Sequence, residues 1–351
     1  MQTFQTLGSL PLTVDSYALD GLSREVSSDF VRHTTLVRLR GENHEGVGED
    51  VTYDAGDQQA FQRSGSNLPL TGRFDLRGFS ALVGELDLFP RSPSTPASRY
   101  YRRWAFESAA LDLALRQAQR SLAAQLKIEP SPVRFVVSTR LGKPPTATAV
   151  RRWLDLYPET RFKLDATSSW DDALIEQLVA THSVDSLDFK GAYKGTIVDQ
   201  APDAGLYARV ARAFPGAWLE DPELTPATEA ALAGNLDRVT WDAPVHSVED
   251  ISGLRHAPRM VNIKPSRFGS LEALFDAFDY CREHEIGMYG GGQFELGPGR
   301  GHIQYLAALF HADAPNDVAP GGYNEPEPRA GLPTSPLPPR VAPTGFRWID
   351  D

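Results

Sequence analysis

Four side chains that could do chemistry follow one another at regular intervals in the second half of the chain. Asp188, Glu220 and Asp242 each stand at the end of a short strand-like run, and Lys264 ends another. The steps between them are roughly 20 to 30 residues, about one strand-plus-helix unit of a (β/α)8 barrel. Because the strands of such a barrel end on one face, these side chains are expected to converge.

Three carboxylates that converge repel one another unless a cation neutralises them. Hard oxygen ligands suit Mg²⁺. We therefore predict that Asp188, Glu220 and Asp242 hold Mg²⁺. Lys264 beside them is the candidate acid/base group.

The composition is that of a globular protein larger than one small core. The chain has 351 residues, of which 41% are hydrophobic and 23% charged, so a barrel of ~250 residues plus a smaller domain is expected. A net charge of -11 argues against a nucleic-acid partner or an anionic membrane surface.

Cysteine usage and the first residues favour a cytoplasmic location. Cys281 is the single cysteine, which excludes an internal disulfide, and its helix-like surroundings predict a buried structural thiol. Residues 1–10 have no basic region followed by an apolar core, and no apolar run approaches ~18 residues.

Residues 1–130 are predicted to form an α+β capping domain. Residues 35–40 and 46–49 read as the two strands of a hairpin, and residues 100–126 as a long amphipathic helix. Residues 15–29 are polar and read as a loop that could close over the barrel mouth.

Residues 131–324 alternate short strands with helical patterns, which predicts a parallel (β/α)8 barrel. The predicted strands are 134–139, 161–164, 186–189, 217–219, 238–241, 261–264, 287–289 and 316–318. The predicted helices are 147–156, 171–181, 204–214, 226–233, 247–254, 271–283 and 300–311. The Pro-rich tail, 325–351, is expected to pack back on the cap through Phe346 and Trp348.

Motifs spread over nearly the whole chain carry a resemblance to a known family. They are Gly46-Val47-Gly48-Glu49, the Ala-rich run 107–115, Leu187-Asp188, Leu219-Glu220-Asp221-Pro222, Trp241-Asp242, Asn262-Ile263-Lys264-Pro265, and Gly290 to Arg300 with its glycines. Their order and spacing resemble the enolase superfamily, and within it the muconate-lactonizing enzyme and o-succinylbenzoate synthase subgroup.

The resemblance implies a Mg²⁺-dependent lyase or isomerase acting on a small carboxylate substrate. In such enzymes a base removes the proton α to the carboxylate, and the metal stabilises the resulting enediolate. The first specific prediction is dehydration of the o-succinylbenzoate synthase kind, which needs only one lysine. Cycloisomerisation or racemisation comes next, and a catalytically silent, acid-binding barrel is the alternative from another class. The resemblance also implies a homo-oligomer.

Two departures from the family pattern leave alternatives open. Lys190 stands where the family commonly has Asn, so its ammonium could point to a substrate carboxylate or replace the metal. The family's Lys-x-Lys pair aligns here either with Arg161 and Lys163 or with Lys163 and Asp165. We slightly favour the first alignment, in which Lys163 is the second acid/base residue and opposes Lys264. In the second alignment, the second lysine has become an aspartate.

Further residues are candidates for contacting the substrate. Gln293 and Glu295 follow three glycines at a strand end, where backbone can approach a ligand closely. Arg140, just beyond the first barrel strand, could hold a distal carboxylate in a bidentate fork. Together with Lys190, these residues form the predicted substrate-binding set.

Overall fold

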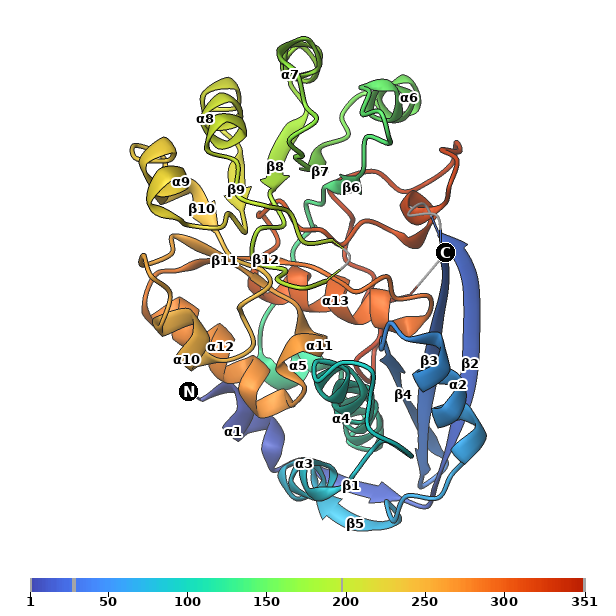
Figure 1. Cartoon of the computed structure of the whole chain (residues 1–351). Helices are drawn as coiled ribbons and strands as arrows, with labels where there is room; N and C mark the ends of the chain where they lie inside the picture. The colour runs from blue at the N-terminus through green and yellow to red at the C-terminus, as the bar shows by residue number, and fades with distance from the viewer. Residues whose placement is uncertain (1, 27–29, 197, 350–351) are drawn as a thin grey trace.

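The computed structural model describes residues 2–26, 30–196 and 198–349. The chain folds into an antiparallel cap and a parallel α/β barrel, joined by a C-terminal tail (Figure 1). The cap strands are β1 (Pro11–Val14), β2 (Ser16–Val26), β3 (Phe30–Gly41), β4 (His44–Asp50) and β5 (Gly72–Asp75). The cap helices are α1 (Thr3–Gly8), α2 (Ala55–Ser64), α3 (Leu76–Glu85), α4 (Ser98–Gln117) and α5 (Leu122–Leu126).

The predicted cap hairpin is confirmed as β3 and β4. The two strands are antiparallel, and their register closes at Gly41 opposite His44. Glu42 and Asn43 form the turn with φ of 51° and 63°. Positive φ at both central residues is what a two-residue turn needs to match the twist of its strands.

The prediction of a loop at residues 15–29 is wrong for most of that stretch. β2 pairs antiparallel with β3 from Ser16 opposite Arg40 to Val26 opposite Phe30. The polar side chains of β2 face solvent, while its backbone is hydrogen-bonded to β3. A polar stretch can therefore be a strand with one face in solvent, and its polarity was not evidence for a loop. Residues 27–29 lie outside the described part of the chain.

The cap helix α4 is shorter than predicted, because the helix ends at Gln117. Gln119 has φ of 55°, and Ser121 then caps the separate helix α5 by accepting from the backbone N–H of Ala124 at 3.1 Å. α4 packs directly on β4. Gly46 and Gly48 of that strand lie so close to the α4 backbone that a side chain at either would overlap it.

The barrel strands are β6 (Val137–Thr139), β7 (Phe162–Asp165), β8 (Val184–Asp188), β9 (Trp218–Glu220), β10 (Val239–Thr240), β11 (Met260–Ile263) and β12 (Gly287–Gly290). The helices of the barrel part are α6 (Thr148–Leu156), α7 (Asp172–Val179), α8 (Ala204–Ala213), α9 (Pro226–Ala231), α10 (Val248–Ser252), α11 (Pro265–Phe268), α12 (Leu271–Glu283) and α13 (Pro298–Phe310). The 3-10 turns are η1 (Leu236–Arg238) and η2 (Gly321–Asn324).

The parallel strands close into a ring through isolated bridges. β6 to β10 are neighbours in sequence order, and β11 pairs with β12. The remaining joints are single residue pairs: Trp241 with Val261, Gly291 with Asp317, and Asn316 with Phe135. The predicted eighth strand is therefore present as the short segment around Asn316 and Asp317. In Figure 1 the helices α6 to α9 fan around the outside of this ring.

The C-terminal tail contacts a cap helix and a barrel helix. Phe346 is fully buried, stacks on His302 of α13 at 4.2 Å between ring centres, and donates its backbone N–H to Asp112 of α4. Trp348 packs edge-on against Tyr305 at 6.5 Å. These contacts join a cap helix to a barrel helix. Cys281 is buried and unpaired, as predicted.

Within the described ranges, no helix combines the length and the apolar character that crossing a membrane requires.

The contact between β4 and α4 predicts a steric test of the cap. A Cβ at position 48 would lie 1.9 Å from the Ala105 carbonyl oxygen, so Gly48→Ala should destabilise the protein by about 3 kcal/mol or more. Gly216→Ala is the matched control, because a Cβ there meets no atom within 4 Å. Urea unfolding of the two variants measures the difference. Equal stability would show that β4 and α4 are not packed this closely.

Candidate active site

The carboxyl ends of β7, β8 and β9 bring acidic side chains to one level. In the parallel register Asp165 pairs with Asp188, and Asp188 pairs with Glu220. Asp188 and Glu220 are completely buried. The convergence expected from the spacing of these residues therefore occurs at the mouth of the barrel.

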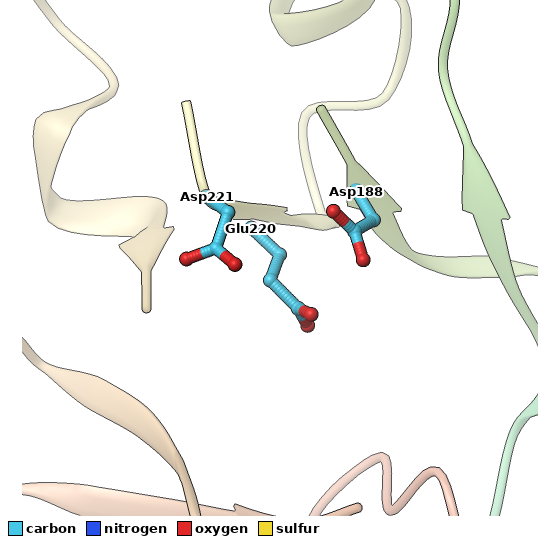
Figure 2. Close-up of side chains that lie close together, drawn as sticks. All are labelled: Asp188, Glu220 and Asp221. Carbon is cyan, nitrogen blue, oxygen red and sulfur yellow. The ribbon is translucent and has the colours of Figure 1, made fainter. Parts of the chain in front are cut away.

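Asp188, Glu220 and Asp221 form an acidic cluster, in which one oxygen of each carboxylate lies within 4.8 Å of the others. Figure 2 shows Asp188 and Asp221 on either side of Glu220. Neighbouring residues of a strand normally point to opposite faces. Asp221 has φ of 48°, so the chain departs from strand geometry at this residue, and its carboxylate lies near that of Glu220. The sequence analysis missed Asp221 as a cluster member, and its one signal was its place directly after Glu220.

The Asp221 carboxylate also fixes the end of the next strand. It accepts the backbone N–H of Asp242 at 2.8 Å and that of Ala243 at 2.9 Å. A carboxylate offers about four lone-pair sites, so each oxygen still has capacity for a cation.

Asp242 lies beside the acidic cluster but is engaged by other groups. Its Oδ2 accepts from Lys264 Nζ at 2.8 Å and from the Tyr193 hydroxyl at 2.6 Å. Arg267 Nη1 lies 3.1 Å from Oδ1. The role of Asp242 as a metal ligand stays a prediction. The structure adds Tyr193 and Arg267, which were not among the predicted site residues.

Lys163 lies in the barrel interior, with its side chain only 2% exposed. Its ammonium pairs with Glu220, lies 3.3 Å from Asp188 Oδ2, and lies 3.8 Å from Asp317 Oδ2. Lys163 and Lys264 are both present at the site, but they bind different carboxylates.

The structure places the residues of the two possible Lys-x-Lys alignments as follows. Arg161 precedes β7 and pairs with Asp185 near the opposite end of the barrel. Lys163 and Asp165 are thus the two β7 residues that share a face towards the mouth. In the second alignment, an aspartate stands at the position of the family's second lysine.

Asp165 is contacted by two cations. Arg140 Nε lies 3.2 Å from its Oδ2, and Lys190 Nζ lies 3.7 Å from its Oδ1. Lys190 also pairs with Asp188, and its backbone N–H donates to Asp188 Oδ1 at 3.0 Å. The structure thus brings together two of the four predicted substrate-binding residues.

Gln293 and Glu295 are held by the loop between β12 and α13 and by the cap. Glu295 accepts the Gln293 backbone N–H at 2.6 Å and lies 3.2 Å from Arg300. The Gln293 side chain accepts from the hydroxyl of Tyr53, a cap residue, at 2.8 Å. These contacts give Glu295 a role within its own loop, while the buried Nε2 of Gln293 has no hydrogen-bond partner among the described residues.

Two family models cover most of the chain. The C-terminal domain of the family described as "Domain of unknown function (DUF8230)" matches residues 129–325, and its N-terminal domain matches residues 5–125. The chain belongs to the DUF8230 family.

Solved structures show that this DUF8230 chain has the fold of the enolase superfamily. A superfamily member from Listeria innocua is 18% identical, covers 88% of this chain and 86% of its own, and gives a TM-score of 0.64. A Pseudomonas fluorescens muconate lactonizing enzyme complexed with muconolactone is 19% identical over 88% of each chain, with a TM-score of 0.60. A Methylococcus capsulatus dipeptide epimerase complexed with a Mg ion is 17% identical over 91% of this chain and 89% of its own, with a TM-score of 0.63. The resemblance predicted from the motifs is confirmed at the level of the fold.

Curated relatives match only part of the DUF8230 chain. An o-succinylbenzoate synthase from Bacillus subtilis is 36% identical over 61 residues, which are 17% of this chain and 16% of that protein. One from Listeria innocua is 31% identical over 84 residues, 23% of this chain and 22% of that protein. The match to these relatives therefore spans about a fifth of their length or less.

The pKa is raised for two of the four buried carboxylates of this site and lowered for the other two. Burial and the neighbouring carboxylates raise the pKa of Glu220 to about 8 and that of Asp221 to about 7. Burial opposes ionisation of Asp188 and Asp242 too, but Lys190 and Lys163 hold the pKa of Asp188 at about 2. Arg267 and Lys264 hold the pKa of Asp242 well below its usual range.

A divalent cation fits the acidic cluster. Three buried carboxylates supply hard oxygen donors within a short distance of one another. Burial and the neighbouring carboxylates raise the pKa of Glu220 and of Asp221, and a divalent cation bound between them would oppose both effects. The donor set and its charge both suit Mg²⁺.

The raised pKa values predict how stability depends on pH when metal is removed. A carboxyl whose pKa is raised on folding stabilises the folded state below its unfolded pKa, and this contribution is lost as pH rises through the folded pKa. In chelator, the midpoint of thermal unfolding should therefore fall as pH rises from about 5 to about 8.5, because Glu220 and Asp221 must ionise.

Two comparisons make this test specific. Glu220→Gln keeps the shape of the side chain and should flatten the pH dependence, and a divalent cation added at high pH should restore the midpoint of the unsubstituted protein. If the thermal midpoint of Glu220→Gln falls with pH as steeply as that of the unsubstituted protein, ionisation of Glu220 does not cause the pH dependence.

Proposed function

We propose that this DUF8230 protein is a Mg²⁺-dependent lyase or isomerase that begins by removing the proton α to a substrate carboxylate. The observation that carries the proposal is the position of Lys264, whose ammonium is held 2.8 Å from Asp242 beside the acidic cluster. A lysine next to a cluster of buried carboxylates at barrel strand ends is the arrangement that this chemistry requires.

To act as a base, Lys264 must first give up the proton that it carries as an ammonium, and the neutral amine can then accept the α-proton and return it. It is 7% exposed and follows β11 directly, so the strand fixes the start of its side chain. Asp242 orients the amine, and Asp242 is itself fixed by Arg267 and Tyr193. Removal of a weakly acidic α-proton needs such a fixed base, since a small displacement of the base lowers the rate strongly.

Asp188, Glu220 and Asp221 would hold the metal, and Asp242 is the further candidate ligand. When bound, Mg²⁺ supplies positive charge for the carboxylate oxygens as negative charge develops on them. Lys163 pairs with Glu220 and so helps to fix one of the proposed ligands.

Dehydration of the o-succinylbenzoate synthase kind is the specific reaction that we favour. It needs one lysine as base and then acid, and the chain presents Lys264 at the mouth while Lys163 lies deeper, among carboxylates. The two partial matches to o-succinylbenzoate synthases support the same choice. Racemisation, which uses bases on two faces, and cycloisomerisation are the alternatives within the superfamily.

A second candidate is a silent barrel that binds acids without turning them over. The observation that favours it is that Lys163 and Lys190 both pair with members of the acidic cluster, where they would compete with a metal.

Proton exchange separates these functions. A panel of carboxylic acids with α-protons is incubated in D₂O with Mg²⁺, and deuterium uptake at the α-carbon is followed by NMR. Lys264→Ala should reduce exchange at least about 100-fold. Lys264→Arg should do the same while keeping the positive charge beside Asp242, because an arginine does not give up its proton.

The exposed Lys143 provides a matched control, and Lys143→Ala should exchange at the unsubstituted rate. If both Lys264 variants are folded by circular dichroism and still exchange the α-proton, Lys264 is not the base. Binding of an acid without any exchange would favour the silent barrel.

A further inference from the structure

A cavity of about 220 Å³ lies at the end of the barrel opposite the acidic cluster. Phe135 and Thr160, which line it, come just before β6 and β7, whereas the acidic cluster stands where the barrel strands end. The turn that follows α6 and residues of the C-terminal tail form its sides. One water takes up roughly 30 Å³ of the liquid, so the cavity has room for a small organic molecule.

Three aromatic side chains, Phe135, Tyr157 and Tyr323, line this cavity. The Tyr323 ring is inclined by 61° to that of Phe135 and by 52° to that of Tyr157, with ring centres 5.3 and 5.7 Å apart. Both tyrosine hydroxyls are engaged by the tail, because Tyr157 donates to the Arg329 carbonyl at 2.8 Å and Tyr323 to the Pro333 carbonyl at 3.0 Å. The tail thus fixes these rings, and they offer a ligand ring surface rather than hydroxyl groups.

The charge at this cavity is negative. Glu159 is the one carboxylate among the residues that line it, and no lysine or arginine lines it. Within residues 2–26, 30–196 and 198–349, the exposed Glu159 side chain has no ion pair or hydrogen bond. Two arginines of neighbouring segments, Arg152 and Arg329, pair with Glu327 and Glu325 instead. The described part of the chain therefore leaves the carboxylate beside the aromatic rings without a balancing cation.

This combination of rings and one carboxylate selects among classes of ligand. An anion would be repelled by Glu159 with no cation to offset the repulsion, and a metal ion would find few oxygen donors among ring surfaces. A neutral apolar molecule would leave the charge of Glu159 unpaired. An organic ammonium uses both features, because its alkyl groups pack on aromatic faces, which attract its positive charge, while the carboxylate balances that charge.

We propose that this cavity is a binding site for a small organic ammonium compound. Glu159 pairs with the charge of the ligand, and Phe135, Tyr157 and Tyr323 contact its alkyl groups. Leu156, which is 43% exposed and also lines the cavity, adds apolar contact near the solvent. The site lies at the other end of the barrel from the acidic cluster, so the inference does not depend on the proposed function.

Choline and its uncharged counterpart test the ligand class. Calorimetry would compare choline with 3,3-dimethyl-1-butanol, which has the same shape without the charge, and excess Mg²⁺ would keep choline from the acidic cluster. The protein should bind choline at one site, and it should bind the alcohol about tenfold more weakly, because the alcohol gains neither the ion pair nor the attraction of the rings for a cation.

Two variants separate the contributions of the carboxylate and the rings. Glu159→Gln should weaken choline severalfold and leave the affinity for the alcohol unchanged. Phe135→Leu keeps an apolar side chain but removes one ring, so it should weaken choline more than it weakens the alcohol. The matched control is Glu176→Gln, because Glu176 is an exposed glutamate of α7 that does not line the cavity. This control should change neither affinity.

The same measurements can overturn the proposal. Equal affinities for choline and the alcohol, an unchanged choline affinity in Glu159→Gln, or no saturable choline binding at millimolar concentration would each do so. Sedimentation with phosphatidylcholine vesicles tests the other source of the same chemical group. Vesicle binding that is lost in Glu159→Gln, without binding of free choline, would point to a lipid headgroup and would overturn the assignment of a small free ligand.

Discussion

Repulsion among buried carboxylates is the constraint on which the rest of this structure depends. Four of them, at positions 188, 220, 221 and 242, are completely buried at one end of the barrel. Such groups cannot all be ionised in a low-dielectric interior unless cations lie beside them. The chain places four cations there, Lys163, Lys190, Lys264 and Arg267, and all of them are nearly or largely buried too.

These cations are shared unevenly among the four carboxylates. Asp242 is neutralised by Lys264 and Arg267, which fixes the proposed base. Among the described residues, the Asp221 carboxylate accepts hydrogen bonds only from backbone amides, and its pKa is raised to about 7. Asp242 thus carries two cations, whereas Lys163 and Lys190 pair with Glu220 and Asp188, and Asp221 has no ion-pair partner among the described residues.

The cap contributes to this site by holding one loop of the barrel. Arg32 donates to the carbonyls of Gln293 and Phe294, and Glu49 accepts the backbone N–H groups of Leu296, Gly297 and Gly299. Both cap side chains are buried. Cap side chains therefore bind both carbonyl and N–H groups of one barrel loop. The cap must be folded for that loop at the barrel mouth to be in place.

Residue spacing predicted the barrel and its strand ends well, because strand order and direction follow from a period of about one strand and one helix. It failed where local backbone geometry decides. Asp221 joins the cluster through a positive φ. The polar strand β2 has its backbone satisfied by β3, the next strand along the chain, and the polar side chains of β2 did not indicate that pairing. Arg161, Lys163 and Asp165 alternate along the chain, so the sequence pattern alone could not show that β7 begins at Phe162 and leaves Arg161 before the strand.

Affinity for Mg²⁺ is the most direct test of the account. Calorimetry on chelator-stripped protein would compare the unsubstituted chain with Asp188→Asn, Lys190→Asn and the distant control Asp237→Asn. The account predicts one site in the unsubstituted protein, lost in Asp188→Asn and retained in Asp237→Asn. Binding that appears only in Lys190→Asn would mean that the ammonium occupies the place of the cation. That result would contradict a metal-dependent reaction at this site.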